Sequence, residues 1–452
     1  MSPEEFRRHG HDVIDWIADY LADIDRYPVL AGVNPGDLAA RLPADGPEEG
    51  EPMERILADF RETIVPALTQ WNHPRFLGYF SISSSPPAIL AEALAAAVNA
   101  NAMLWRTSPA GTELEQVTLG WLRQWLGLPS DYFGIIFDTA STSSLHAIVC
   151  AREEAAAPAS ELVLYCSDQA HSSIEKAAVT AGIPRENIRK IPSDERFRMR
   201  PDALEREVQN DIVEGRRPFC VVATAGATPA ASVDPVPAIA DVCQRHNLWL
   251  HVDAAYAGIA AISGTHRGVL AGCDRAQSLV TNPHKWLLTP VDCSVFYTRR
   301  PEVQRRVFSL TPEYLRTAED PRALNFMDYG LPLGRRFRAV KLWFVMRYYG
   351  RKGLAAVIER HCAAARTFAS WVAEDPRFEL CAPVEFSLVC FRLRGPDEPN
   401  RELLDRINAS GLALLSHTVL RGRFVLRLAV GNYRTELADL ERVWRFLASP
   451  SG

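Results

Sequence analysis

The feature that most constrains this chain is a series of short apolar runs that alternate with helical stretches, between about residues 71 and 350. The runs lie at 133–137, 162–166, 219–224, 248–252, 278–280 and 293–298, and several carry no charge. Uncharged runs of this length are typical of strands buried on both faces of a parallel sheet. Helical stretches at about 143–156, 173–181, 203–214 and 236–246 fill the gaps. The pattern predicts an α/β fold with a large, mostly parallel sheet.

The two ends of the chain differ from this central region. Helical spacing predicts helices over about 3–24 and 53–69, joined by a stretch rich in proline and glycine. Near the other end we expect a long helix over about 334–375 that breaks near Gly350, then strands at 378–381, 386–392, 412–417 and 423–428 with helices at 401–410 and 435–447. The prediction is therefore three segments: 1–75 helical, 76–350 α/β, and 351–452 a small α+β domain.

Composition argues against several classes of protein. A formal net charge of −5 does not suit a nucleic-acid protein that works through a basic field. The most apolar stretch, 86–105, is broken by Glu92, Asn99 and Asn101, so a membrane span is not expected. Nine cysteines without a CxxC pair favour reduced thiols, and charged residues at the start do not suit a signal peptide. We expect a cytoplasmic protein.

Small hydroxyl residues follow the first predicted strand of the sheet. The run from Asp138 through Thr139, Ala140 and Ser141 precedes a predicted helix. The N–H groups and dipole of a helix N-terminus attract anions, although an ordinary N-cap would also favour these residues. Because no GxGxxG or GxxxxGK[ST] motif follows a strand, a small phosphate ligand is favoured over a dinucleotide or a nucleoside triphosphate.

Three further strands are followed by residues that could react. His171, Asp253 and Lys285 each come shortly after one of the apolar runs. Each also has a purely structural interpretation: a hydrogen-bonding histidine, a capping carboxylate, or a lysine that reaches water. A buried lysine, however, loses its proton readily and can attack a carbonyl. Ligands bind beyond the carboxyl ends of the strands in such sheets, so we expect these side chains to meet.

One cofactor needs all of these features. Pyridoxal 5′-phosphate (PLP) takes a lysine for its aldehyde, a carboxylate for its ring nitrogen and an anion cup for its phosphate. An adjacent carboxylate favours the protonated ring, which can then accept the electron pair of a carbanion. The residues therefore predict a PLP site that includes Lys285 and Asp253, and no metal site is expected.

Longer motifs run nearly end to end through the chain. They are Glu5-Phe6-Arg7-Arg8; His73-Pro74 with Tyr79-Phe80; Trp105 with Ser108-Pro109-Ala110 and Thr112-Glu113-Leu114-Glu115; Ser167-Asp168-Gln169-Ala170-His171-Ser172-Ser173; His251-Val252-Asp253-Ala254-Ala255-Tyr256; Asn282-Pro283-His284-Lys285-Trp286; Pro332-Leu333-Gly334-Arg335-Arg336-Phe337-Arg338; and Phe424-Val425-Leu426-Arg427. With them the chain resembles the group II PLP-dependent decarboxylases, most closely the aromatic-L-amino-acid decarboxylases. The resemblance implies fold type I with a seven-stranded sheet, and decarboxylation of an aromatic L-amino acid (Tyr, Phe, Trp or dopa) to an arylalkylamine.

The resemblance also implies roles for single residues. Lys285 would form an imine with the cofactor and Asp253 would pair with its ring nitrogen. His171 would stack on one ring face, with Ala255 against the other. The phosphate would be held by Thr139, Ala140, Ser141, Asn282 and His284, with Thr224 near the ring or lysine.

A further implication concerns a loop at about 311–329. Its Tyr314 would return a proton to the substrate carbon after CO₂ leaves. In the family this loop reaches the other subunit, so a homodimer is implied, with the N-terminal helices clasping the partner.

The substrate side departs from the animal enzymes. The expected pocket residues are Phe80, Ser81, Ile82, Asn101, Met103, Trp105 and Gly334. Gly334 adds no bulk, which in the family tends to accompany larger aromatic rings. Asp138 would repel a phosphate, so its side chain is expected to point away.

Three alternatives stay open. An aromatic aldehyde synthase shares the chemistry, but the presence of both His171 and Tyr314 argues against it. A glutamate or sulfinate decarboxylase would need a cationic clamp, for which Arg106 is the one candidate seen nearby. A catalytically silent partner protein would have no use for an intact Lys285 and Asp253.

Overall fold

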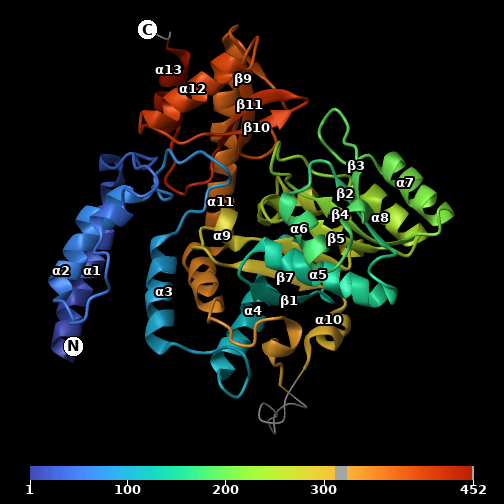
Figure 1. Ribbon diagram of the computed structural model, residues 1–452, viewed down its shortest axis with the longest axis horizontal. Coiled ribbons are helices and arrows are strands. Elements are labelled where there is room, and N and C mark those ends of the chain that lie inside the picture. Colours follow the sequence, from blue (N-terminus) through green and yellow to red (C-terminus); the bar gives the residue numbers. More distant parts are fainter. Residues whose placement is uncertain (311–322, 450–452) are drawn as a thin grey trace. The chain divides into compact units, whose positions relative to one another are not determined.

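The structure is a computed structural model that describes residues 1–310 and 323–449 (Figure 1). The chain divides into two compact units. A terminal unit contains Met1–Ser81, Thr367–Cys381 and Phe391–Gly452, and a central unit contains Ile82–Arg366 and Ala382–Cys390. The division into three segments expected from the sequence stays a prediction. Among the described helices, none is long and apolar enough to cross a bilayer.

The central unit is built on a seven-stranded sheet with the order β1-β7-β6-β5-β4-β2-β3. Its strands are β1 (Phe133–Phe137), β2 (Leu162–Ser167), β3 (Ile188–Ile191), β4 (Arg217–Thr224), β5 (Trp249–Asp253), β6 (Ser278–Thr281) and β7 (Ser294–Thr298). β7 runs antiparallel to both β1 and β6, and the pairs from β6 to β3 are parallel. The predicted α/β fold with a mostly parallel sheet is thereby confirmed.

Helices precede, connect and follow these strands along the chain (Figure 1). They are α3 (Pro86–Val98), α4 (Pro109–Leu126), α5 (Ala140–Ala155), α6 (Ser172–Thr180), α7 (Pro201–Val213), α8 (Val236–Arg245), α9 (Pro283–Trp286), α10 (Pro301–Phe308) and α11 (Ala339–Glu374). As predicted, the long helix α11 is interrupted at Gly350, whose φ of 62° is not helical. Helix α5 packs against β1, β4, β5, β6 and β7, so it spans much of one sheet face.

Side-chain alternation along β5 decides which residues face α5. Trp249 belongs to a buried apolar cluster with residues of α5 and α6. Successive side chains of a strand point to opposite faces, so His251 and Asp253 share the face of Trp249. In the parallel pairings His251 lies opposite Ser278 of β6, and Asp253 lies opposite Thr224 of β4. The sheet register thus places Thr224 beside Asp253 at the carboxyl ends of β4 and β5, and Ser278 beside His251 in the middle of β5.

The outer edge of β1 is closed by an ion pair instead of an eighth strand. Glu115 Oε1 accepts the backbone N–H of Ile136 at 2.8 Å, and Arg335 Nη2 donates to the Ile136 carbonyl at 3.0 Å. The two side chains also pair with each other at 2.7 Å and are nearly fully buried. Both backbone groups of this edge residue are therefore satisfied.

The terminal unit begins with α1 (Pro3–Ala22), which starts at a capping box between Ser2 and Glu5. The helix predicted over about 53–69 is helical over 53–67, but its winding changes along its length. Only α2 (Met53–Asp59) is α-helical, followed by a π-helical turn at Phe60–Ile64 and a 3₁₀ turn at Val65–Ala67. Pro66 has no N–H and cannot continue regular α-helical bonding, which accounts for the change of winding.

A smaller antiparallel sheet has the order β10-β11-β9-β8, with β8 (Phe378–Leu380), β9 (Leu388–Leu393), β10 (Ser416–Leu420) and β11 (Arg423–Ala429). Helices α12 (Glu398–Ala409) and α13 (Leu437–Ala448) follow β9 and β11. The strand predicted at 412–417 is observed at Ser416–Leu420, so it starts four residues later and ends three residues later. The reason is a two-residue turn at Arg421 and Gly422, both with positive φ, which sets the hairpin register.

Candidate active site

A cavity of about 220 Å³ lies beyond the carboxyl ends of β1, β2, β4, β5 and β6, within the central unit. We call it the carboxyl-end cavity. It is lined by all ten residues expected to bind the cofactor: Thr139, Ala140, Ser141, His171, Thr224, Asp253, Ala255, Asn282, His284 and Lys285. Ser173, Gly226, Thr228 and Tyr256 line it as well. Tyr314 lies outside the described residues.

One wall of the cavity is the start of α5, which we call the anion cup (Thr139, Ala140 and Ser141). Thr139 is the N-cap, and its hydroxyl accepts the N–H of Thr142 at 3.5 Å. Thr139 can therefore cap the helix while an anion binds beside it. The first turn of this 16-residue helix has further N–H groups without an intrahelical partner, and these can donate to an anion. Asp138 accepts the N–H of Thr139 at 2.6 Å and is not a lining residue.

Two side-chain nitrogen atoms lie close together at Asn282 and His284, which also line the cavity. The backbone N–H of Cys293 donates to His284 Nδ1 at 2.9 Å, so a neutral ring carries its hydrogen on Nε2. Burial lowers the pKa of His284 to about 4, which keeps the ring neutral. His284 Nε2 lies 3.2 Å from Asn282 Nδ2, so two donors meet there. An anion that accepted from both would satisfy them.

Lys285 and Asp253 are an amine and a carboxyl group that line the same cavity. Asp253 ends β5, is 6% exposed, and accepts the N–H of Ala255 at 3.1 Å. Surrounding protein lowers the pKa of Lys285 by desolvating its ammonium, and the charge of Asp253 opposes that shift. A lysine with a lowered pKa presents more of the neutral amine, the form that attacks an aldehyde.

His171 caps the next helix and also lines the cavity. Its Nδ1 accepts the N–H of Ser173 at 3.2 Å, which leaves the hydrogen of a neutral ring on Nε2. Burial lowers the pKa of His171, while the charge of Asp253 acts in the other direction. His171 is thus a hydrogen-bonding histidine that caps α6, and its ring is also available to a ligand in the cavity.

Two buried oxygens of the cavity are left without partners. Thr224 Oγ1 and Asn282 Oδ1 have no hydrogen-bond partner among the residues that the structure describes. Unsatisfied buried polar atoms cost on the order of 1–3 kcal/mol each, so such atoms in a cavity point to a polar ligand. Anion cup, paired donors, carboxylate and lysine together fit PLP better than an apolar molecule.

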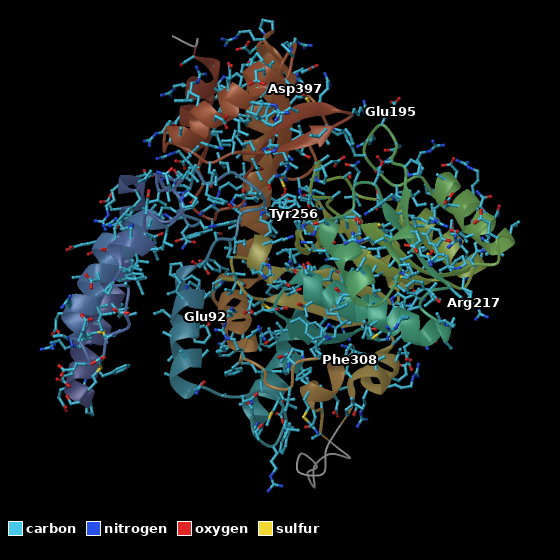
Figure 2. All side chains as sticks on the ribbon, in the orientation of Figure 1. Glu92, Glu195, Arg217, Tyr256, Phe308 and Asp397 are labelled. Atoms are coloured by element: carbon cyan, nitrogen blue, oxygen red, sulfur yellow. The ribbon has the colours of Figure 1, made fainter. Side chains whose placement is uncertain are left out.

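Sequence reasoning missed four lining residues. Tyr256, labelled in Figure 2, stacks on Trp286 with ring centres 4.8 Å apart, and its hydroxyl lies 2.7 Å from Ser387 Oγ. It stands inside a motif already noted, three residues after Asp253, which was an available signal. Gly226 and Thr228 lie in an irregular loop after β4, where no periodic pattern marks them.

The residues expected at the substrate side do not line the carboxyl-end cavity. Asn101, Met103 and Gly334 lie together in the central unit, because Asn101 Nδ2 is 3.4 Å from Met103 Sδ and 3.8 Å from where a Cβ on Gly334 would be. Trp105 donates to Glu113 at 2.8 Å in the same unit, which also contains Ile82. Phe80 and Ser81 belong to the terminal unit, where Arg427 lies over the Phe80 ring.

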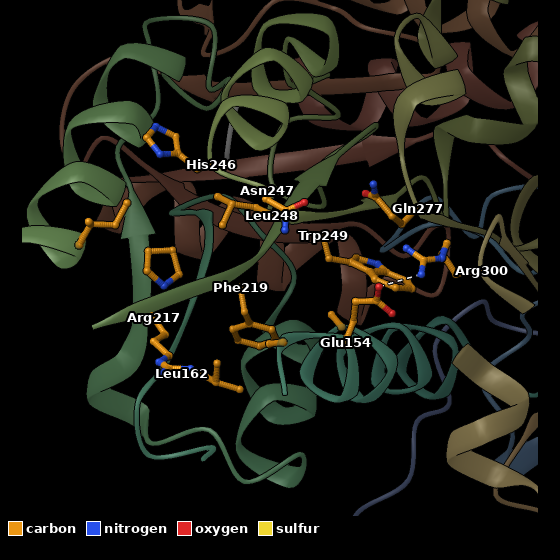
Figure 3. A pocket seen from close by; sticks show the side chains of 14 residues that line it. Glu154, Leu162, Arg217, Phe219, His246, Asn247, Leu248, Trp249, Gln277 and Arg300 are labelled. Atoms are coloured by element: carbon orange, nitrogen blue, oxygen red, sulfur yellow. Dashed lines mark hydrogen bonds and ion pairs between the residues drawn. The ribbon is translucent and has the colours of Figure 1, made fainter. Parts of the chain in front are cut away.

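A larger cavity of about 440 Å³ lies at the other end of the same strands (Figure 3). We call it the amino-end cavity, since Leu162, Arg217 and Trp249, which line it, begin β2, β4 and β5. Its charged side chains are paired: Glu154 with Arg300 at 2.7 Å, and His246 with Glu205 at 2.6 Å. It is twice as large as the carboxyl-end cavity, but none of the predicted reactive residues line it.

Comparison with known proteins matches this geometry. Residues 35–394 match the family model described as the pyridoxal-dependent decarboxylase conserved domain. The aromatic-L-amino-acid decarboxylase of Bos taurus is 41% identical, over 99% of this chain and 96% of its own. The solved structure of Oryza sativa TDC with PLP and tryptamine superposes with a TM-score of 0.97 at 37% identity, covering 99% and 97% of the two chains. Rhodiola rosea 4-hydroxyphenylacetaldehyde synthase gives 0.93 at 35% identity, covering 99% and 98%.

Proposed function

Because the chain belongs to the pyridoxal-dependent decarboxylase family, we propose that it converts an aromatic L-amino acid to the corresponding arylalkylamine and CO₂. The family makes the chain a PLP-dependent carboxy-lyase. The choice of an aromatic substrate is supported by the aromatic-L-amino-acid decarboxylases among its relatives, and by a similar structure that was solved with tryptamine.

The observation that carries this proposal is that Lys285 and Asp253 line one cavity, which also holds unsatisfied polar atoms. PLP, when bound, supplies a ring that takes up the electron pair left behind by CO₂. Lys285 would offer its neutral amine to the aldehyde carbon. Asp253 would hold a proton on the ring nitrogen, and this carboxylate is what makes the ring an effective electron sink.

The remaining lining residues would orient the reacting groups. The anion cup, with Asn282 and His284, would hold the phosphate through N–H and O–H donors. His171 would lie against one ring face and Ala255 against the other, with Thr224 Oγ1 turned toward the ring or the lysine. Such positioning would hold the bond between the substrate's Cα and its carboxylate perpendicular to the ring plane, so that the electron pair left by CO₂ enters the ring's π-system.

Tyr314 would return a proton to the substrate carbon after CO₂ leaves. The segment that carries it would act in the site of a partner subunit, so the active form would be a homodimer clasped by the N-terminal helices. Replacing Tyr314 with Phe should then turn the product from amine to carbonyl compound, with O₂ consumed as the oxidant and ammonia and H₂O₂ released. Amine formation at the parental rate would exclude this role.

A second candidate function is aromatic aldehyde synthesis, favoured by the similarity to the Rhodiola rosea synthase. His171 and Tyr314, both present here, favour the decarboxylase instead. One assay separates the candidates: CO₂, amine, aldehyde and ammonia are measured with Phe, Tyr, Trp, dopa, His and Glu. Amine in proportion to CO₂ supports the proposal, and aldehyde in its place supports the synthase.

Borohydride reduction tests the cofactor attachment itself. The full-length chain is reduced, digested and mapped, and the label is expected on the peptide that contains Lys285. Lys190, a lysine of the same unit outside the cavity, provides the control for random modification. A label elsewhere, or no label at all, would overturn the proposed site.

A further inference from the structure

A chain of buried hydrogen bonds joins the anion cup to the strand that bears Asp253. Ser144, in the second turn of α5, has its hydroxyl 3.2 Å from His251 Nε2. The other ring nitrogen of His251, Nδ1, lies 2.9 Å from Ser278 Oγ in β6. We call these three residues the hydroxyl–imidazole bridge. All three are fully buried, with 0% exposure.

The bridge places polar groups in the buried interior, where apolar side chains would have a smaller desolvation cost. His251 lies in the middle of β5 and its ring is held at both nitrogens. Burial lowers its pKa to about 4, so the ring is neutral near pH 7 and needs no counter-charge. Trp249 Nε1 donates to the same Ser278 hydroxyl at 2.9 Å, which restricts how that hydroxyl can turn.

The position of the bridge gives it a geometric meaning. His251 stands two residues before Asp253 and on the same face of β5. Ser144 stands three residues after Ser141, so it belongs to the helix whose start forms the anion cup. The bridge therefore connects the element that would hold a phosphate to the element that would hold a ring nitrogen.

We propose that His251 is a positioning residue that sets the spacing between the anion cup and the Asp253 carboxylate. The inference rests on the proposed function, since only a ligand that carries both an anion and a ring nitrogen on one rigid frame needs that spacing. Such a ligand gains affinity over its separate pieces only when both subsites are held at the distance it spans. Without the hydrogen bonds of the bridge, the affinity for the joined ligand should fall, while each subsite still binds its own piece.

The test compares three ligands on the full-length chain freed of cofactor: PLP, pyridoxal and inorganic phosphate. The variant His251→Gln should weaken PLP binding about tenfold, the scale of one lost net hydrogen bond, while pyridoxal and phosphate bind as before. The absorbance maximum of bound PLP should shift as well. Equal weakening of PLP and of either piece would overturn the proposal, as would unchanged PLP binding.

A matched control is available on the same helix. Ser143 is also fully buried and its hydroxyl lies 2.9 Å from Ser294 Oγ, but Ser294 belongs to β7, which contributes no lining residue to the cavity. Ser144→Ala should reproduce the selective loss of PLP affinity, and Ser143→Ala should not. If His251→Gln fails to fold, the two serine variants still decide the question.

A double variant ties the effect to the bridge. Adding Ser144→Ala to His251→Gln should weaken PLP no further, because the same contact is already lost. Additive losses would show that the two residues act separately and would overturn the proposal. Failure of the parental chain to bind PLP at all would instead contradict the proposed function.

Discussion

The carboxyl-end and amino-end cavities lie at opposite ends of the same strands, yet they differ in how their polar groups are satisfied. The amino-end cavity has twice the volume, about 440 against 220 Å³. Glu154 and Arg300 of its lining pair with each other, and His246 pairs with Glu205 outside the lining. None of its residues contributes a buried unpaired side-chain atom within the described part of the chain. The smaller cavity holds Thr224 Oγ1 and Asn282 Oδ1 without partners.

Of these two cavities, the one with unmet hydrogen-bonding capacity, and not the larger one, holds the predicted reactive residues. A protein surface compensates its own charges wherever no ligand will do so. Partnerless donors and acceptors persist where a ligand completes them. Substitutions at the two ends should therefore have very different consequences.

The largest difference is expected for the lysine. Lys285→Ala should lower CO₂ release on the order of 10⁴-fold, because no other group replaces a covalent attachment. Arg300→Ala at the amino end should leave turnover within about twofold, since its ion pair is partly exposed. Initial rates with the preferred amino acid check both. A Lys285→Ala enzyme that kept a tenth of the parental rate would remove the distinction between the two cavities.

Acid should destabilise the fold through several buried histidines, of which His284 lines the carboxyl-end cavity. Burial lowers the pKa of His146, His251 and His284 to about 4, against about 6.5 in an unfolded chain. The unfolded state then binds more protons between these values, so stability is full above pH 6.5 and falls as pH drops toward 4. Each histidine should cost about 1.4 kcal/mol per pH unit in that window.

Urea unfolding at pH 7.5, 6.0 and 5.0 measures this dependence. His284→Gln removes one titrating group and should reduce the slope by one proton. An unchanged slope would mean that His284 is not neutral in the folded chain.

The carboxylate is expected to matter next. Asp253→Asn keeps the shape but cannot stabilise a protonated ring nitrogen, so turnover should fall on the order of a hundredfold. The variant should still form the lysine attachment detected by borohydride. Loss of attachment together with turnover would mean that Asp253 holds the cavity together and does not tune the ring.

A smaller effect is expected at the anion end. Asn282→Ala removes one donor from the pair with His284, and PLP should bind about tenfold more weakly. Pyridoxal, which lacks the phosphate, should bind equally well to both chains. Asn247→Ala, in the amino-end cavity, is the matched amide control and should change neither affinity. Weaker pyridoxal binding would argue that Asn282 contacts the ring.

The smallest effect is expected for Glu154→Gln, which breaks the Arg300 ion pair of the amino-end cavity (Figure 3). The free energy of unfolding should change by less than about 1 kcal/mol, with PLP affinity unaltered. Thermal unfolding and a cofactor titration check both quantities. A marked loss of affinity would show that the two ends of the sheet are coupled.

Most of the sheet could be predicted because its strands are uncharged. The exception is β3, which the sequence analysis missed. Arg189 and Lys190 stand inside this four-residue edge strand, so it has no apolar run. In the smaller sheet, β10 was displaced because a turn at Arg421, a residue type that rarely takes positive φ, sets its register. The local pattern of apolar residues predicts which segments are buried strands, but it does not predict which residues pair across neighbouring strands.

The candidate site divides in the same way. Residues that follow strands, such as Asp253 and Lys285, could be expected to meet, since the carboxyl ends of parallel strands share one edge. Ser144 and Ser278 could not be foreseen, because their contact with His251 depends on the register of β5 with β6 and on where α5 crosses the sheet. Thr228 lies in a loop without regular structure, where spacing gives no signal.

The Glu115–Arg335 pair at the outer edge of β1 also affects whether the protein aggregates. An uncapped edge strand is a template onto which a second molecule can add a strand, the first step of amyloid-like assembly. By occupying both backbone groups of Ile136, the two side chains block that addition. Loss of Arg335 would leave a buried carboxylate uncompensated, at a cost of about 3–5 kcal/mol, and an open edge beside it. The expected phenotype is an insoluble protein, not a slow enzyme.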